Sequence, residues 1–242
     1  MWKRTSALPM PADFAATDER PGSACRFRLK DNTVMPPSPV TLEIFTDCTC
    51  PWCYFMSGRI ARLKKEYGIQ IRRRAFPFHS DTPEDGVSLN VYFSEDPFVI
   101  KERMRNLKET AKGLGLPFGS PKMIYNGRSA QELGLWAESK DKGDAFLQAL
   151  YKAYFVDGKN IAKIPVLADI AASVGLPVEN VVKVLDAGAF KETVDRDWAL
   201  AEEMNILVLP TFVMNRDRLV GAQPYHKLQR LVEKNGVVMK RT

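Results

Sequence analysis

The tetrapeptide CPWC at residues 50–53 separates two segments of different hydrophobic period, and this arrangement constrains the fold more than any other feature of the chain. Before it, residues 40–46 (VTLEIFT) alternate branched or aromatic side chains with others, which is typical of a β-strand. After it, apolar residues recur at spacings of four, three and four, as on one face of an amphipathic helix that ends near Gly68. These residues are Met56, Ile60, Leu63 and Tyr67. Because residues 69–76 indicate a second strand, the tetrapeptide is expected at the first turn of a strand-helix-strand unit.

Residues 96–205 carry helical patterns almost throughout. Asp96 is a suitable N-cap with proline directly after it, where a helix tolerates the missing N–H. Ser129 and Glu132 have the spacing of a capping box, which predicts a further helix start at that point. Strand signals return only at residues 210–214 and 219–220, which predict a hairpin, and a final helix is expected from Pro224 to Asn235.

These patterns predict an α/β protein in which a thioredoxin-like fold carries an inserted all-helical domain. The expected parts are an N-terminal extension, the first half of the thioredoxin-like domain, the helical insertion and the second half. Their expected bounds are 1–38, 39–95, 96–205 and 206–242. The extension is rich in proline and lacks a hydrophobic period, which predicts disorder, and Met35 near its end is an alternative translation start to Met1.

Composition excludes several classes of protein. The 45% hydrophobic content suits a packed globular core, and no apolar run approaches the roughly 18 residues of a membrane span. The net charge of +6 arises from 35 basic and 29 acidic residues that are mixed along the chain, so no nucleic-acid partner is expected. The densest basic cluster, at residues 72–74, is interpreted as a solvated strand edge, with an anionic ligand or a nucleic acid as the alternative. Without a secretory signal pattern near Met1, the expected location is cytoplasmic.

The chain has four cysteines, and three of them fall close together at Cys48, Cys50 and Cys53. Cys50 is expected at a helix N-terminus, where backbone N–H groups and the helix dipole favour a thiolate and lower the thiol pKa. We therefore predict that Cys50 attacks a disulfide. Cys53 lies one helical turn further, deeper in the fold, and is predicted to resolve the mixed disulfide.

Structural zinc sites also use a C-x-x-C spacing, but they normally draw four ligands from two such motifs or from paired histidines. The chain has one such motif, and its two histidines, His79 and His226, are far apart. Both are interpreted as packing or surface residues, and neither a metal nor another cofactor is expected. Cys48 is interpreted as a bystander thiol, with the alternative that it is an accessory redox sulfur.

The segments FTDCTCPWCYFMSGRI, VLPTFVMN and GAQPYHKL resemble the DsbA family, particularly its FrnE-like branch. The similarity covers most of residues 41–235, and residues 153–161 resemble the helical insert of that branch. The chain departs from the branch pattern at Cys48, which is an addition, and at Val208-Leu209, where the branch typically has Gly-Val.

This resemblance implies a thiol-disulfide oxidoreductase with a cis peptide bond before Pro210, which would face the cysteine pair. The expected substrate-contacting residues are Pro51, Trp52, Leu209 and Pro210, with helix packing as an equal alternative for Trp52. Its partners would be protein or small-molecule thiols and disulfides, with glutathione among them. Related glutathione-dependent 2-hydroxychromene-2-carboxylate isomerases and transferases use serine where this chain has Cys50. They remain an alternative, as does a non-enzymatic thiol or metal-binding module.

Overall fold

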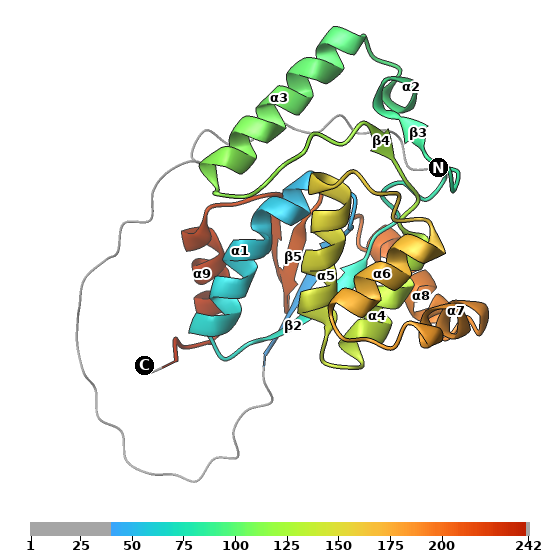
Figure 1. Cartoon of the computed structure of the whole chain (residues 1–242). Coiled ribbons are helices and arrows are strands. Elements are labelled where there is room, and N and C mark those ends of the chain that lie inside the picture. The colour runs from blue at the N-terminus through green and yellow to red at the C-terminus, as the bar shows by residue number, and fades with distance from the viewer. Residues whose placement is uncertain (1–39, 241–242) are drawn as a thin grey trace, which may run out of the picture.

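The computed structural model describes residues 40–240, which contain a central four-stranded mixed sheet surrounded by helices (Figure 1). The strand order is β2-β1-β5-β6, with β1 parallel to β2 and antiparallel to β5. The four strands are β1 (Thr41–Thr46), β2 (Gln70–Ala75), β5 (Thr211–Met214) and β6 (Asp217–Val220). The expectations for residues 1–38, including the translation start, lie outside the described residues.

Helix α1 (Pro51–Glu66) connects the parallel strands β1 and β2, as the hydrophobic period predicts. It packs beside the C-terminal helix α9 (Tyr225–Lys234) (Figure 1), and the two are tied by a 2.6 Å hydrogen bond from Tyr225 Oη to Glu66 Oε2. Both faces of β1 are covered, and its apolar side chains from Leu42 to Phe45 are almost completely buried. The start of α1 therefore lies at the end of a central strand with a buried apolar core.

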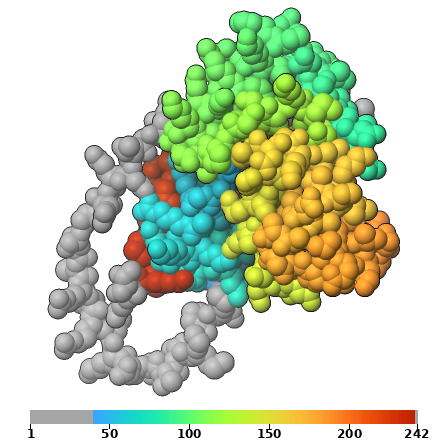
Figure 2. Space-filling model, in the orientation of Figure 1, coloured from blue at the N-terminus to red at the C-terminus, as the bar shows by residue number. Residues whose placement is uncertain are grey.

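The segment between the two halves of the sheet is mainly helical, as expected. Its elements are α2 (Leu89–Phe93), α3 (Pro97–Gly113), α4 (Arg128–Glu138), α5 (Gly143–Tyr151), the π-helical turn η2 (Lys152–Val156), α6 (Ile164–Ser173), α7 (Glu179–Asp186) and α8 (Lys191–Glu203). A small ribbon of β3 (Val87–Ser88) and β4 (Met123–Ile124) crosses the expected boundary at residue 96. On the surface, α1 lies between the α3 segment above it and the later helices of the insertion (Figure 2).

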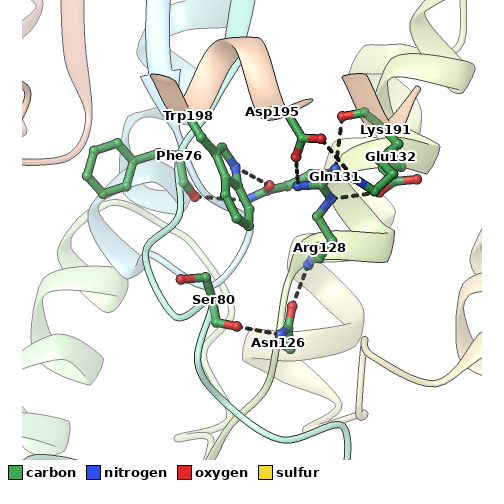
Figure 3. A network of polar contacts seen from close by, with 9 residues as sticks. All are labelled: Phe76, Ser80, Asn126, Arg128, Gln131, Glu132, Lys191, Asp195 and Trp198. Carbon is green, nitrogen blue, oxygen red and sulfur yellow. Dashed lines mark hydrogen bonds and ion pairs between the residues drawn. The ribbon is translucent and has the colours of Figure 1, made fainter. Parts of the chain in front are cut away.

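The predicted capping box at Ser129 is wrong. Helix α4 begins two residues earlier than that box requires, with Gly127 as its N-cap. The side-chain oxygen of Asn126 accepts a 2.9 Å hydrogen bond from the backbone N–H of Arg128, which satisfies one free amide at the helix start. Glu132 instead forms an ion pair with Arg128, with 2.6 Å between Glu132 Oε1 and Arg128 Nε (Figure 3).

The basic cluster on β2 is only partly a solvated edge. β2 is an edge strand and Arg72 is exposed, as expected. Arg73 forms ion pairs with Glu138 and Asp144 of the insertion, and Arg74 pairs with Glu43 and Asp197. Both guanidinium groups are thus paired with carboxylates of the same chain. These two arginines therefore support packing of the insertion rather than an anion-binding site.

Candidate active site

The turn from β1 into α1 holds the cysteine pair in the arrangement that the sequence predicts. Cys50 is the N-cap of α1 and has extended backbone angles, with φ −84° and ψ 115°. Pro51 occupies the first helical position, where its missing N–H leaves no partner unsatisfied. The Cys50 carbonyl accepts hydrogen bonds from the backbone N–H groups of Cys53, at 3.1 Å, and Tyr54, at 3.3 Å. Both thiols are free and belong to the same helical turn.

The prediction that Cys50 has a lowered thiol pKa is wrong for this structure. Cys50 is only 1% exposed, and burial raises the pKa of its thiol well above the ordinary value, with a further rise from its hydrogen bond to the Cys53 thiol. The backbone N–H of Cys53 lowers the pKa of Cys50, as the helix position predicts, but this effect is smaller than that of burial. Cys53 is 2% exposed, so it is not the more deeply buried of the two.

A buried carboxylate beside the pair was not identified from the sequence. Asp47 is 3% exposed and accepts hydrogen bonds from the backbone N–H of Thr49, at 2.7 Å, and from the Thr49 hydroxyl. Its other oxygen accepts a 2.6 Å hydrogen bond from Gln131 of α4. Burial raises the pKa of Asp47, and these hydrogen bonds oppose the rise. Its place three residues before Cys50 was visible in the sequence, but nothing local indicated its burial.

Cys48 faces the insertion. It is 4% exposed, and a Cβ atom placed on Gly127 would lie only 2.9 Å from its sulfur, so Gly127 and Cys48 are in close contact. Burial, followed by the negative charge of Asp47, raises the pKa of the Cys48 thiol. It lies two residues before Cys50 in the same buried connection between β1 and α1. The structure thus brings all three cysteines into one buried cluster.

Aromatic side chains of the insertion cover the start of α1. Tyr54 stacks on Phe155 of η2 with ring centroids 5.2 Å apart, and Phe118 lies 5.8 Å from Phe55. The Tyr54 hydroxyl donates a 2.9 Å hydrogen bond to the carbonyl of Pro117. Trp52, between the two cysteines, is half-buried and meets Phe55 edge-on at 5.6 Å. These contacts make the insertion one wall of the site.

The Leu209-Pro210 peptide bond is cis, as the resemblance implies. Both residues are buried at the start of β5. In the register of β1 and β5, Phe45 is opposite Thr211, so Pro210 continues toward the end of β1 that leads into the cysteine turn. The Pro210 carbonyl accepts a 2.8 Å hydrogen bond from the N–H of Gly221. Contact between the proline ring and the two sulfur atoms stays a prediction.

The two histidines lie in different surroundings. His79 is buried with its Nδ1 2.9 Å from the Tyr92 hydroxyl, and burial lowers its pKa to about 3. His226 is exposed on α9. Both placements agree with the interpretation as packing and surface residues. Within residues 40–240, no three histidine, cysteine or acidic side chains form a cluster suited to a metal ion. In the same part of the chain, the helices lack the combined length and apolar character of a bilayer span.

Solved structures with similar folds include a probable DsbA oxidoreductase from Streptomyces coelicolor. It shares 24% sequence identity and a TM-score of 0.74, over 84% of this chain and 92% of that one. The cytosolic disulfide reductase DsbM from Pseudomonas aeruginosa, solved with GSH, is 22% identical with a TM-score of 0.61, over 80% of this chain and 100% of that one. At these identities the likeness shows the thioredoxin-like fold.

A sequence relative is the ClpXP adapter protein SpxH of Bacillus subtilis, which is 26% identical over 193 residues. The alignment covers 73% of this chain, which spans 58% of the length of that relative. The sequence profile of the DSBA-like thioredoxin domain matches residues 41–233, from the first strand of the sheet to the C-terminal helix. The chain therefore belongs to the DSBA-like thioredoxin domain family.

Proposed function

We propose that the protein is a thiol-disulfide oxidoreductase in which Cys50 attacks and Cys53 resolves. The observation that carries this proposal is the pair of free thiols in the first turn of α1, which interact with each other within a DSBA-like domain. A third thiol, Cys48, is a neighbour of the pair and is proposed as an accessory rather than an essential sulfur.

The reaction is a pair of sulfur exchanges. The Cys50 thiolate attacks one sulfur of a substrate disulfide, a bond forms between the two sulfurs, and the other substrate sulfur leaves as a thiolate that takes a proton from water. The Cys53 thiolate then attacks the Cys50 sulfur and releases the second substrate thiolate. Two electrons pass from the cysteine pair to the substrate, and the reverse sequence oxidises a substrate dithiol.

Access to Cys50 requires a local opening, because the residue is 1% exposed. Trp52 and Pro51 are half-buried beside it and are proposed to contact substrate when the site opens. Leu209 and Pro210 are proposed to present the start of β5 to an extended segment, in the manner of strand addition. The proposed substrates are protein or small-molecule thiols and disulfides, glutathione included, and the proposed location is cytoplasmic.

Two other functions can be separated from this one. Glutathione-dependent isomerases of the related group use serine at the position of Cys50, so the thiol itself favours redox chemistry. The SpxH relative is named as an adapter protein, which would require binding to a partner without thiol exchange. An adapter would keep its binding in a Cys50→Ser variant, whereas an oxidoreductase would lose its activity.

Trapping of mixed disulfides tests the proposal. With a disulfide substrate such as insulin, Cys53→Ser is expected to accumulate a covalent complex, because Cys50 still attacks and no resolving thiol follows. Cys50→Ser is expected to form none. The Cys48→Ser variant is the matched control and should keep insulin reduction. Equal trapping by the Cys50 and Cys53 variants would contradict the assignment of the two roles.

A further inference from the structure

The turn that leads into β5 is closed by a side chain. Thr211 is 1% exposed, and its hydroxyl donates a 2.6 Å hydrogen bond to the carbonyl of Val208. Threonine hydroxyls close turns in this way by bonding a carbonyl three residues earlier. The bond spans Leu209 and Pro210, which are the two residues proposed to present the start of β5 to an extended substrate segment.

Two further contacts hold the same turn against the end of β6. The N–H of Gly221 donates a 2.8 Å hydrogen bond to the Pro210 carbonyl. A Cβ atom placed on Gly221 would lie 3.8 Å from Cγ1 of Val208, so the Val208 side chain lies next to this glycine. The carbonyls of Val208 and Pro210 are therefore both engaged within the protein, one on each side of Leu209.

The backbone of Leu209 differs from that of its neighbours. In the described part of the chain, neither its N–H nor its carbonyl forms a hydrogen bond. Both groups are therefore free to pair with an extended chain, as in strand addition. Such pairing is stronger when the receiving backbone is already held in one conformation, because less freedom is lost on binding.

We propose that Thr211 is a positioning residue, whose hydroxyl holds the turn so that the backbone of Leu209 pairs with a polypeptide substrate. The inference rests on the proposed function for the reaction itself. A residue that acts in this way strengthens the binding of peptide substrates and leaves the exchange chemistry of Cys50 unchanged. Small disulfides without peptide groups make no use of the pairing, so they separate the two effects.

The test compares the reduction of insulin with that of hydroxyethyl disulfide, which has no peptide groups, with dithiothreitol as the reductant in both assays. Thr211→Val keeps the size of the side chain but removes the hydroxyl donor. It is expected to raise KM for insulin about three- to tenfold, the factor that one weakened hydrogen bond produces, with kcat changed by less than about twofold. Its kcat/KM for hydroxyethyl disulfide should stay within about twofold of the unmodified protein. Thr211→Ser keeps a hydroxyl donor and should retain the KM for insulin.

A matched control removes a hydroxyl that makes the same kind of bond elsewhere. Thr110 of α3 donates a 2.9 Å hydrogen bond to the carbonyl of Asn106, and Thr110→Val should leave both activities unchanged. If Thr211→Val does not fold, Thr211→Ala removes the same donor and should show the same difference between the two substrates. An unchanged KM for insulin, or an equal loss of both activities, would overturn the proposal.

Failure of the proposed function has a different signature, because the unmodified protein would then reduce neither disulfide. In that case amide hydrogen exchange of residues 207–209 still tests the role of Thr211. Exchange at these amides should be faster in Thr211→Val than in the unmodified protein, with exchange in β1 unchanged. Equal exchange in the two proteins would show that the hydroxyl does not hold the turn and would overturn the proposal.

Discussion

Opposing influences act on the pKa of the Cys50 thiol. The backbone N–H of Cys53 favours the thiolate, while burial favours the neutral thiol and has the larger effect. A residue at the same helix position with an open approach to solvent would have a lowered pKa. The closed conformation described here therefore protects the thiol, and its reactivity depends on exposure to substrate.

The first prediction concerns this protection. In the reduced, folded protein at pH 7, Cys50 should react with iodoacetamide much more slowly than free cysteine, because burial raises the pKa of its thiol and shields the sulfur from the reagent. Unfolding in guanidinium should remove the difference. Peptide mass spectrometry after timed quenching measures the rate. Reaction faster than free cysteine in the folded state would show that the closed conformation is not the dominant one.

The second prediction concerns Gly127, which is packed against Cys48. Gly127→Ala should reduce the free energy of unfolding by about 1–3 kcal/mol, because the new Cβ would lie 2.9 Å from the Cys48 sulfur. Gly134→Ala is a matched control in the same helix, with nothing within 4 Å of its added Cβ, and should stabilise by up to about 1 kcal/mol. Urea unfolding measures both values. If the sulfur is the cause, Cys48→Ala should restore most of the loss, and a double variant no more stable than Gly127→Ala would contradict this reason.

At the scale of elements, the buried carboxylate of Asp197 connects helix α8 to strand β2. Asp197 is 2% exposed. Its carboxylate forms a 2.8 Å ion pair with Arg74 and accepts a 3.1 Å hydrogen bond from the backbone N–H of Ala75. A buried carboxylate without a cation is strongly destabilising. The interface between the insertion and the sheet thus depends on an arginine of the run that the sequence analysis interpreted as a solvated strand edge.

The third prediction follows from this pairing. Arg74→Met should destabilise the fold by about 3 kcal/mol or more, because it leaves Asp197 buried without its cation. The matched control is Arg72→Met, which changes an exposed arginine two positions earlier on the same strand. It should lower the free energy of unfolding by less than about 0.5 kcal/mol. Thermal and urea unfolding measure the two effects. Similar losses in both variants would mean that the strand itself, rather than the pairing with α8, responds to the change.

At the scale of the whole molecule, the site draws on parts of the chain that are far apart in sequence. The first half of the thioredoxin-like domain supplies the cysteine turn, and the insertion supplies Gln131, Gly127 and the aromatic wall. The second half supplies the cis peptide bond at Pro210. Because each part is incomplete alone, the site is expected to form only when the entire domain folds.

The fourth prediction concerns the N-terminal extension. Its composition offers no apolar face that could pack on the domain, so deletion of residues 1–38 should change the melting temperature by no more than about 2 °C. Insulin reduction should also be retained. Calorimetry of the two proteins side by side provides the measurement. A loss of several degrees would show that the extension contributes to the folded domain.

The sequence by itself determined the main elements of the sheet and its flanking helices, in their order. Hydrophobic period and helix-start residues act between near neighbours, so β1, α1, β2, the hairpin of β5 and β6, and the Asp96 cap of α3 could be predicted. The same short-range reasoning located Cys50 at the N-cap of α1. The resemblance of VLPTFVMN to a known family, rather than any pattern, indicated the cis bond at Pro210.

Only the tertiary structure decided how the cysteines are surrounded. The hydrogen bond from Gln131 to Asp47 joins residues 84 positions apart, and Cys50 is only 1% exposed once the chain has folded. A capping box was expected at Ser129, but helix α4 starts earlier, where the side chain of Asn126 accepts from the free backbone N–H of Arg128. Local sequence fixes which groups are present in the site, whereas the dielectric surroundings and the distant hydrogen-bond partners that set their pKa values exist only once the chain has folded.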